Sequence, residues 1–259
     1  KRIYNTIMIE PSFNLGDGNW AGKSGNLLGY HKISDKFYAD DLTFARASTG
    51  TIVNTEGLIE SVASGMPRVD YLNNSNGSLL LESQSTNLIT YSEDFSNAAW
   101  TKQAVTVVSN AAISPNGALN ADKLIPSAVS TTHQIVNLGL ISSQTCATSV
   151  FAKADGISTF EILDGASAVN GVAFDLSNGT FTNKGSGIGI IEYYGNGWYR
   201  CISVAITNGF RLYCPSSASA VSGDGTIGVY IYGAQLEAGS YPTSYIPTSG
   251  TTVTRLLDT

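Results

Sequence analysis

Residues 225–248 have the sequence GTIGVYIYGAQLEAGSYPTSYIPT, and this stretch decides the fold class. In its first half Val229 and Ile231 point to one side of an extended chain, whereas Tyr230 and Tyr232 point to the other. A period of two is typical of a β-strand with one face in a hydrophobic core. We therefore predict a strand whose apolar side is buried and whose tyrosine side lies outside that core.

The alternation ends at Gly239, and Pro242 and Pro247 follow within the next eight residues. Proline cannot donate a hydrogen bond to a β-ladder, and glycine weakens the interior of a strand. We therefore expect the chain to leave the sheet here as an extended, tyrosine-rich tail over the surface.

The composition is that of a turn-rich β protein. The 259 residues include 27 glycines and 13 tyrosines, and only 13% are charged. This length allows one large or two small domains. We find no run of 18 apolar residues, and the apolar stretch near the start is short, so we expect neither membrane insertion nor a secretory signal peptide. The net charge of −6 argues against a nucleic-acid partner, because affinity for the phosphate backbone is largely cationic.

A second informative block covers residues 41–88, where two short β-runs meet at Asn54–Gly57 and predict a hairpin. The block resembles one that precedes the jelly roll in virion proteins of tailed phages. Together with the closing stretch the resemblance covers roughly residues 41–255. Ala45 departs from it, since the pattern usually has Thr or another polar residue there. The matching residues are Thr43, Phe44, Arg46–Ser48, Thr51, Val53, Asn54, Gly57–Glu60, Val62, Ala63, Pro67, Arg68, Asp70, Tyr71, Leu79–Glu82 and Thr86–Leu88.

The remaining sequence, residues 87–259, is expected to form the jelly roll itself. It opens with NLITYSEDFSNAAW, which resembles the first strand, acidic bend and buried Trp of galactose-binding-like jelly rolls. About nine alternating runs follow, with hairpin turns at 177–179 and 195–197. We predict an all-β protein: an antiparallel two-sheet jelly-roll sandwich (87–259), preceded by a small N-terminal β segment (41–86) and an extended arm (1–40).

Several chemistries find little support in the sequence. The arm contains GDGNWAGKSGN, but Asp17 stands where a phosphate-binding loop needs its first glycine. His31 and His133 lack neighbours at metal-ligand spacing. The candidate carboxylates for glycoside hydrolysis fall mostly in turns or at strand ends, where solvated or turn-capping carboxylates are ordinary, so we predict that the protein is not an enzyme. The candidates are Glu93, Asp94, Glu161, Asp164, Asp175, Glu192, Asp224 and Glu237. The three cysteines, Cys146, Cys201 and Cys214, are predicted to be small buried hydrophobic residues. The alternative is a Cys201–Cys214 bridge, if their strands are neighbours.

Jelly rolls of the carbohydrate-binding type often hold a structural calcium between an early acidic bend and the last strand. The resemblance thus points to Glu93 and Asp94 as possible ligands, although Tyr232 stands where the closing strand would supply an acidic residue. No other cofactor is expected.

The candidate ligand-binding residues are aromatic, because flat rings suit the C–H faces of sugars. If Val229 and Ile231, together with Trp198 and Ile202, form the core, the opposite face carries a set of tyrosines and one arginine. The set is Tyr199, Arg211, Tyr213, Tyr230 and Tyr232. The alternative is that Tyr230 and Tyr232 are covered by the arm or by the tail. Trp100 and Trp198 are predicted to be core residues.

The resemblance implies a virion component, assembled in the bacterial cytoplasm, that displays a non-catalytic carbohydrate-binding module for attachment to host-surface glycans. We expect other virion proteins as partners and a homo-oligomer, a trimer before a dimer. One alternative is a purely structural capsid or tail decoration protein. The other is a polysaccharide depolymerase.

Overall fold

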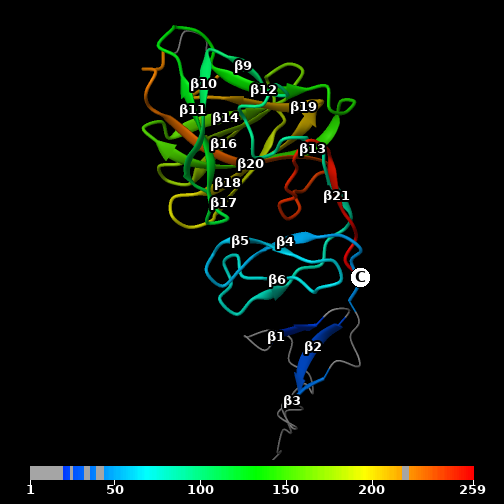
Figure 1. The fold of residues 1–259 in the computed structure, drawn as a ribbon. Coiled ribbons are helices and arrows are strands. Elements are labelled where there is room, and N and C mark those ends of the chain that lie inside the picture. Colours follow the sequence, from blue (N-terminus) through cyan, green and yellow to red (C-terminus); the bar gives the residue numbers. More distant parts are fainter. Residues whose placement is uncertain (1–19, 24–25, 32–35, 39–43, 218–221) are drawn as a thin grey trace, which may run out of the picture.

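The computed structural model describes residues 20–23, 26–31, 36–38, 44–217 and 222–259 (Figure 1). These residues form strands and loops without a helix, as predicted, and so include no helix long and apolar enough to cross a membrane. Two six-stranded antiparallel sheets pack face to face as a sandwich. Each sheet takes strands from distant parts of the chain, as in a jelly roll.

We call the first sheet the covered sheet, because other parts of the chain pack on its outer side. In spatial order it contains β10 (Val105–Ile113), β11 (Leu119–Pro126), β20 (Gly228–Ala238), β13 (Gln144–Asp155), β18 (Tyr199–Thr207) and β17 (Ile188–Tyr193). We call the second the open sheet. Its order is β16 (Thr180–Lys184), β15 (Gly171–Asp175), β14 (Thr159–Leu163), β19 (Gly209–Tyr213), β12 (Gln134–Leu138) and β9 (Thr101–Gln103).

The main core lies between the sheets and is rich in aromatic side chains. The Trp100 ring is buried and meets Phe210 edge-on at 5.3 Å and Phe95 at 5.0 Å, between ring centroids. Phe160 and Phe174, paired across β14 and β15, stack at 5.3 Å. Burying one such ring contributes roughly 1.5–3 kcal/mol to the stability of the fold. The prediction that Trp100 is a core residue is confirmed.

Strand β20 contains a bulge that the alternation does not reveal. Gln235 pairs with Ser149 and Tyr232 with Phe151, so β20 has one residue more than β13 between these pairs. Gly233 takes the left-handed backbone conformation, with a φ of 62°, that such a bulge requires. The extra residue reverses the alternation, so Ala234 and Leu236 join Val229 and Ile231 in the main core.

The outer side of the covered sheet carries a second buried cluster. Phe151, Trp198 and Tyr232 project from the sheet, and Ile59 and Tyr245 pack onto them from elsewhere in the chain. Tyr245 approaches Phe151 edge-on, with ring centroids 5.7 Å apart. Trp198 is therefore buried, as predicted, but in this second cluster.

The expected orientation of β18 is wrong. We expected Trp198 and Ile202 in the main core and Tyr199 and Cys201 on the opposite side. Cys201 instead belongs to the main core, and Tyr199 packs against it. Both sides of β18 are buried, so alternation alone could not tell which side faces the sandwich interior.

The residues over the covered sheet are 44–86 and 239–259, which we call the outer layer (Figure 1). Its hairpin and short strand pairs tie these two parts of the chain together. The strands are β4 (Gly50–Val53), β5 (Ile59–Val62), β6 (Val69–Asp70), β7 (Ser78–Leu79), β8 (Ser85–Asn87) and β21 (Val253–Arg255), paired β4–β5, β6–β7 and β8–β21. The hairpin predicted around Asn54–Gly57 is confirmed. The division of the chain at residue 87 stays a prediction.

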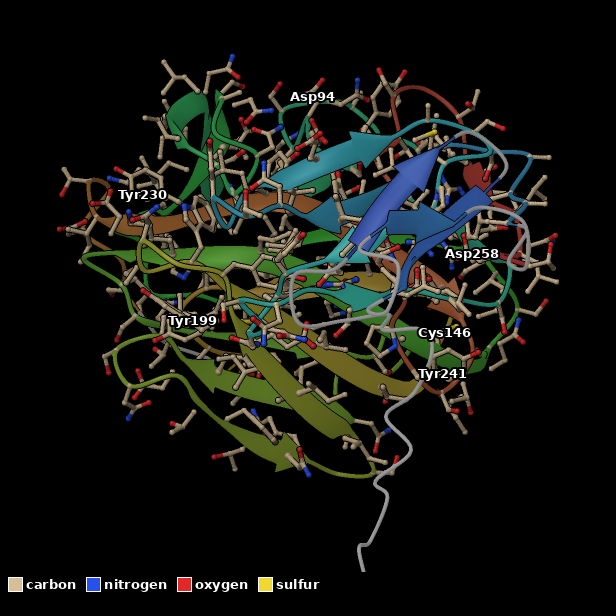
Figure 2. All side chains as sticks on the ribbon, turned by 90° about the horizontal axis from the view of Figure 1, so that it is seen from below. Asp94, Cys146, Tyr199, Tyr230, Tyr241 and Asp258 are labelled. Carbon is tan, nitrogen blue, oxygen red and sulfur yellow. The ribbon has the colours of Figure 1, made fainter. Side chains whose placement is uncertain are left out.

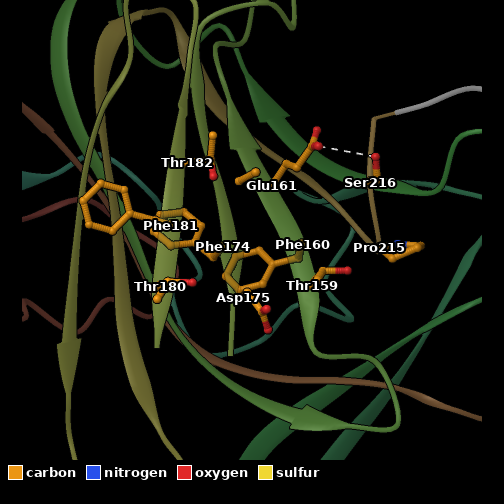
Figure 3. Close-up of a pocket in the computed structure, with 11 residues that line it drawn as sticks. Thr159, Phe160, Glu161, Phe174, Asp175, Thr180, Phe181, Thr182, Pro215 and Ser216 are labelled. Atoms are coloured by element: carbon orange, nitrogen blue, oxygen red, sulfur yellow. Dashed lines mark hydrogen bonds between the residues drawn. The ribbon is translucent and has the colours of Figure 1, made fainter. Parts of the chain in front are cut away.

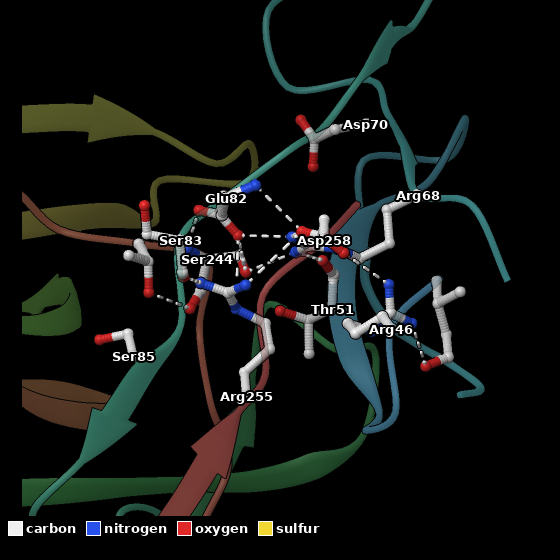
Figure 4. Close-up of polar contacts among 12 residues, drawn as sticks. Arg46, Thr51, Arg68, Asp70, Glu82, Ser83, Ser85, Ser244, Arg255 and Asp258 are labelled. Carbon is white, nitrogen blue, oxygen red and sulfur yellow. Dashed lines mark hydrogen bonds and ion pairs between the residues drawn. The ribbon is translucent and has the colours of Figure 1, made fainter. Parts of the chain in front are cut away.

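A buried ion-pair cluster holds the outer layer together (Figure 4). Asp258 accepts hydrogen bonds from Arg46, at 3.0 Å, and from Arg68, and all three side chains are fully buried. Glu82 lies 2.8 Å from Arg68 and 3.5 Å from Arg255. Arg46, Arg68 and Glu82 belong to the informative sequence block at residues 41–88, so these positions serve the packing of the outer layer.

The three cysteines are buried and free, as predicted. Cys201 lies on the covered sheet and Cys214 follows the last residue of β19 on the open sheet, and both are free, so the bridge left open as an alternative does not form. Burial raises the pKa of the Cys214 thiol to about 12. Within the predicted arm, β1 (Trp20–Lys23), β2 (Asn26–His31) and β3 (Lys36–Tyr38) form an antiparallel sheet, so these residues are not an unpaired extended chain. Much of the glycine-rich loop lies outside the described residues.

Candidate ligand-binding site

The five predicted ligand-binding residues do not form one surface. Tyr230 and Tyr232 lie on the outer side of the covered sheet, and Tyr199 lies on its inner side. Tyr230 and Tyr199 are accordingly well apart in Figure 2. Arg211 and Tyr213 belong to β19 of the open sheet. The prediction of a single tyrosine face is therefore wrong, because it assumed that the alternations of β18, β19 and β20 share one outer side.

Tyr232 is covered by the tail, which is the alternative that the sequence left open. Only 1% of its surface is exposed. Its hydroxyl donates to Glu93 Oε1 at 2.9 Å, and the Tyr245 hydroxyl donates to the same oxygen at 3.0 Å. Burial, with the neighbouring Glu93 charge, raises the pKa of Tyr232 well above its usual range. Tyr232 is therefore a neutral packing residue with a bonded hydroxyl.

Glu93 and Asp94 do not fit a calcium site. Glu93 already accepts the two tyrosine hydroxyls, and Asp94 Oδ1 accepts hydrogen bonds from Ser96 and Asn97 as a turn cap. Calcium requires six to eight oxygen ligands. Within the part of the chain that the structure describes, no group of three or more His, Cys, Asp or Glu side chains could hold a metal ion.

Arg211 and Tyr213 hold neighbouring parts of the open sheet in place. The Arg211 guanidinium donates to Gly165 O at 2.7 Å, to Gln134 Oε1 at 2.9 Å and to the Tyr213 hydroxyl at 3.2 Å. The loop that contains Gly165 is folded around Asp164, whose carboxylate accepts backbone N–H groups from Ala166 through Asn170. Tyr213 is 6% exposed, so its ring offers little surface for stacking. These two residues position the loop beside the open sheet.

A groove of about 240 Å³ lies on the outer side of the open sheet, next to this network (Figure 3). Cross-strand pairing builds it: Glu161 on β14 is opposite Ala173 on β15, and Ala173 is opposite Thr182 on β16. Glu161 is also opposite Tyr213 on β19, which connects the groove to the Arg211 network. The lining residues are Thr159, Phe160, Glu161, Ala173, Phe174, Asp175, Thr180, Phe181, Thr182, Pro215 and Ser216.

Glu161 is the central charged group of this groove. Lys184 Nζ donates to Glu161 Oε1 at 2.7 Å, and the Ser217 backbone N–H donates to Oε2 at 3.0 Å. Burial raises the pKa of this carboxyl, but the hydrogen bonds from Lys184 and Ser217 and the Lys184 charge lower it more. Hydrogen bonds from Ser177 also lower the pKa of Asp175 at the other end of the groove. Both carboxylates are ionised at neutral pH and can accept hydrogen bonds.

The groove combines these acceptors with hydroxyl groups and apolar surface. Thr180 and Thr182 are exposed on β16, and Ala173 and Pro215 add apolar surface. Phe181, between the two threonines, turns to the inner side of the strand, where its ring contacts Phe174. Hydroxyls that donate and accept, beside ionised acceptors and a small apolar patch, match the mixed polar and apolar surface of a sugar.

Most of this groove was not predicted from the sequence. Glu161 and Asp175 were interpreted as solvated carboxylates, and no strand was predicted at 180–184. The sequence TFTNK carries hydroxyls on one side and only one apolar residue, so it lacks the usual signal of a half-buried strand. The available signal was the turn at Asn178-Gly179, which places the next residues antiparallel to β15.

Comparisons with known proteins find little. No family model matches the chain, and no curated protein matches it in sequence. One solved structure with a similar arrangement of strands comes from work described as "Structural basis for the promiscuous specificity of the carbohydrate-binding modules from the beta-sandwich super family". It has 10% sequence identity to this chain and a TM-score of 0.33, and the match covers 87% of this chain and 99% of that one.

Proposed function

We propose that this chain is a non-catalytic glycan-binding module and that the groove on the open sheet is its binding surface. The observation that carries the proposal is the lining of the groove. Two ionised carboxylates and two exposed threonines lie on one strand-built surface, next to Ala173 and Pro215. Neutral sugars present hydroxyls to such acceptors and C–H groups to such an apolar patch.

The same carboxylates argue against a depolymerase. Glycoside hydrolysis needs a carboxylic acid that is still protonated at working pH, so its pKa must be raised. The pKa values of Glu161 and Asp175 are both lowered, and Lys184 neutralises Glu161. The groove therefore binds hydroxyl groups and supplies no general acid.

The biological setting is proposed from the sequence block that resembles tailed-phage virion proteins. In this proposal the module belongs to a virion, attaches to host-surface glycan and assembles with other virion proteins as a homo-oligomer, most simply a trimer. Multivalent display would strengthen weak binding at each site. The second candidate is a purely structural decoration protein, which is favoured by one observation: Arg46, Arg68 and Glu82 of that block are engaged in packing the outer layer.

The test is titration of the full chain with neutral oligosaccharides prepared from host-surface polysaccharide. Glu161→Gln and Thr182→Val should each weaken binding about tenfold, because each removes a hydrogen bond to the sugar. Thr145→Val, an exposed threonine on β13 of the other sheet, is the matched control and should bind like the parent.

Unchanged binding by both groove variants would remove the groove from the site. No binding of any glycan by the parent would favour the structural candidate, and a loss of polymer viscosity on incubation would favour the depolymerase. Sedimentation of the full chain as a monomer at micromolar concentration would count against the oligomer.

A further inference from the structure

A second groove lies where the outer layer meets the covered sheet. Its volume is about 320 Å³, and it belongs to neither the open sheet nor the Glu161 network. Ligand sites occur preferentially at such junctions between packed units. The lining residues are Leu58, Ile113, Ser114, Pro115, Lys153, Tyr194, Asn196 and Trp198.

Three parts of the chain form its walls, and hydrogen bonds tie them together. The Trp198 indole N–H donates to Ile113 O at 3.1 Å, which joins β18 to the end of β10. The Tyr194 backbone N–H donates to Trp198 O at 2.9 Å and closes the turn between them. The Ile59 N–H donates to Pro115 O, also at 2.9 Å, and connects the outer layer. Walls fixed in this way bind a ligand without first being ordered.

Lys153 in this groove and the nearby Lys123 differ in their charged neighbours. Lys153 and Lys123 lie on the two strands that flank β20, and both are opposite Tyr230. Lys123 Nζ is paired with Asp155 at 2.5 Å. Among the described residues, no carboxylate lies within ion-pair distance of Lys153. Its side-chain stem passes the backbone of Gly197, 3.6 Å from where a Cβ would stand, so the chain of Lys153 runs along the turn that borders the groove.

We propose that this groove binds a carboxylate-bearing sugar residue, whose carboxylate pairs with Lys153 and whose C–H face lies on the apolar wall around Ile113. Asn196, exposed at the tip of the turn, supplies an amide for the sugar hydroxyls. The chemistry differs from that of the Glu161 groove, where two carboxylates outnumber one lysine. The inference does not rest on that groove's proposed function.

The experiment is titration of the full chain with a galacturonate oligosaccharide and with a neutral galactose oligosaccharide of the same length, at low and at physiological salt. The parent should bind the acidic probe more tightly, and its affinity should fall with salt because the pairing is electrostatic. Lys153→Gln should lose about tenfold or more of the acidic binding. Lys123→Gln is the matched control, with the same chemical change opposite the same tyrosine, and it should bind like the parent.

Two further variants separate this site from its alternatives. Ile113→Glu places a negative charge on the exposed rim, where the side chain is 63% exposed, and should weaken binding of the acidic probe. Thr145→Val, at the far end of β13 and outside both grooves, should leave it unchanged. Equal affinity of the parent for the two probes would overturn the proposal. So would full binding by Lys153→Gln, or an equal loss in Lys123→Gln, which would indicate attraction by net charge alone.

Discussion

The outer sides of the two sheets differ, although their inner sides share one core. The outer side of the covered sheet carries Phe151, Trp198 and Tyr232 beneath a second layer of chain. The open sheet instead presents exposed threonines along β16 and the Glu161 network. Tyrosines that alternate with aliphatic residues can therefore mark a surface that another layer covers. The candidate glycan groove lies on the sheet whose outer residues are mostly polar.

A covered outer side requires that its polar groups be paired. Gln235 projects from β20 into the outer layer, where its amide oxygen accepts the Ile246 N–H at 2.6 Å and its amide nitrogen donates to Ser244 O. Glu237, two residues on, accepts hydrogen bonds from Ser85 and Thr243. Buried groups left without such partners would cost about 1–3 kcal/mol each. This pairing identifies the outer layer as part of the folded unit.

The strongest test of that conclusion compares the two buried tryptophans. Trp198→Ala opens the second cluster, and Trp100→Ala opens the main core. Both should lower the free energy of unfolding by roughly 3–5 kcal/mol, because each deletes a fully buried ring. Urea denaturation followed by circular dichroism measures both. A Trp198→Ala protein that unfolds like the parent would show that the outer layer adds little to the fold.

Breaking the ion-pair cluster should lower the free energy of unfolding by a somewhat smaller amount. Asp258→Asn removes the charge that Arg46 and Arg68 share, and leaving buried charges unpaired typically costs about 3–5 kcal/mol. The amide retains some hydrogen bonds, so we expect the lower end of that range. Asp155→Asn breaks the partly exposed pair with Lys123 and should cost about 1 kcal/mol or less. Equal losses in the two variants would contradict the special role of the cluster.

The same cluster should make stability depend on acid pH. Burial raises the pKa of Asp258, but its hydrogen bonds and the arginine charges lower it more, and the balance for Glu82 has the same sign. A lowered folded-state pKa contributes stability above the unfolded value, about 4 for both groups, that is lost as the pH falls through the folded value. Urea midpoints should therefore decrease from pH 5 to pH 2.

The control for this pH effect is Asp258→Asn. Its midpoint should depend less on pH in that range than the parent's midpoint does. The slope should not vanish, since Glu161 and Asp164 of the open sheet also have lowered pKa values. An identical pH dependence in the variant and the parent would contradict the prediction.

The smallest expected loss of unfolding free energy is at the bulge in β20. Gly233→Ala places a Cβ at a φ of 62°, about 3.0 Å from Phe151 and Tyr245, and should cost about 2 kcal/mol. Gly195→Ala adds a Cβ at a φ of 80° in open space and should cost about 1 kcal/mol from the backbone alone. Thermal unfolding measures both. A loss at Gly233 no larger than that at Gly195 would mean that the second cluster yields to the new methyl group.

The fold class followed from alternation and turn chemistry, because strands with one buried side carry that signal themselves. The stretch at 225–248 correctly placed Val229 and Ile231 in the core. Alternation could not say which side of β18 faces the interior, since both sides are buried. It also could not reveal that Gly233 reverses the pattern in mid-strand, because a glycine in a strand has several uses.

The site was less predictable than the fold. Residues were grouped by their odd or even positions in alternating strands. Such positions do not show whether residues on different strands lie on the same side of the same sheet. Arg211 and Tyr213 were therefore assigned to the same surface as Tyr230, although they lie on the other sheet. Thr182 and Lys184 attracted no attention because single hydroxyl and ammonium groups on a polar strand carry no motif. Only the pairing of β14, β15 and β16 brings them to Glu161.

The ion-pair cluster also has a consequence for the order of events during synthesis. Arg46 and its partner Asp258 are 212 positions apart in the chain. At the ~5–20 residues per second of a ribosome, the arginine is made roughly 10–40 s before the carboxylate that neutralises it. In that interval residues 44–86 have neither their partner strand β21 nor the sheet on which they rest. The part of the outer layer that is translated first must therefore be among the last parts of the protein to reach its native structure.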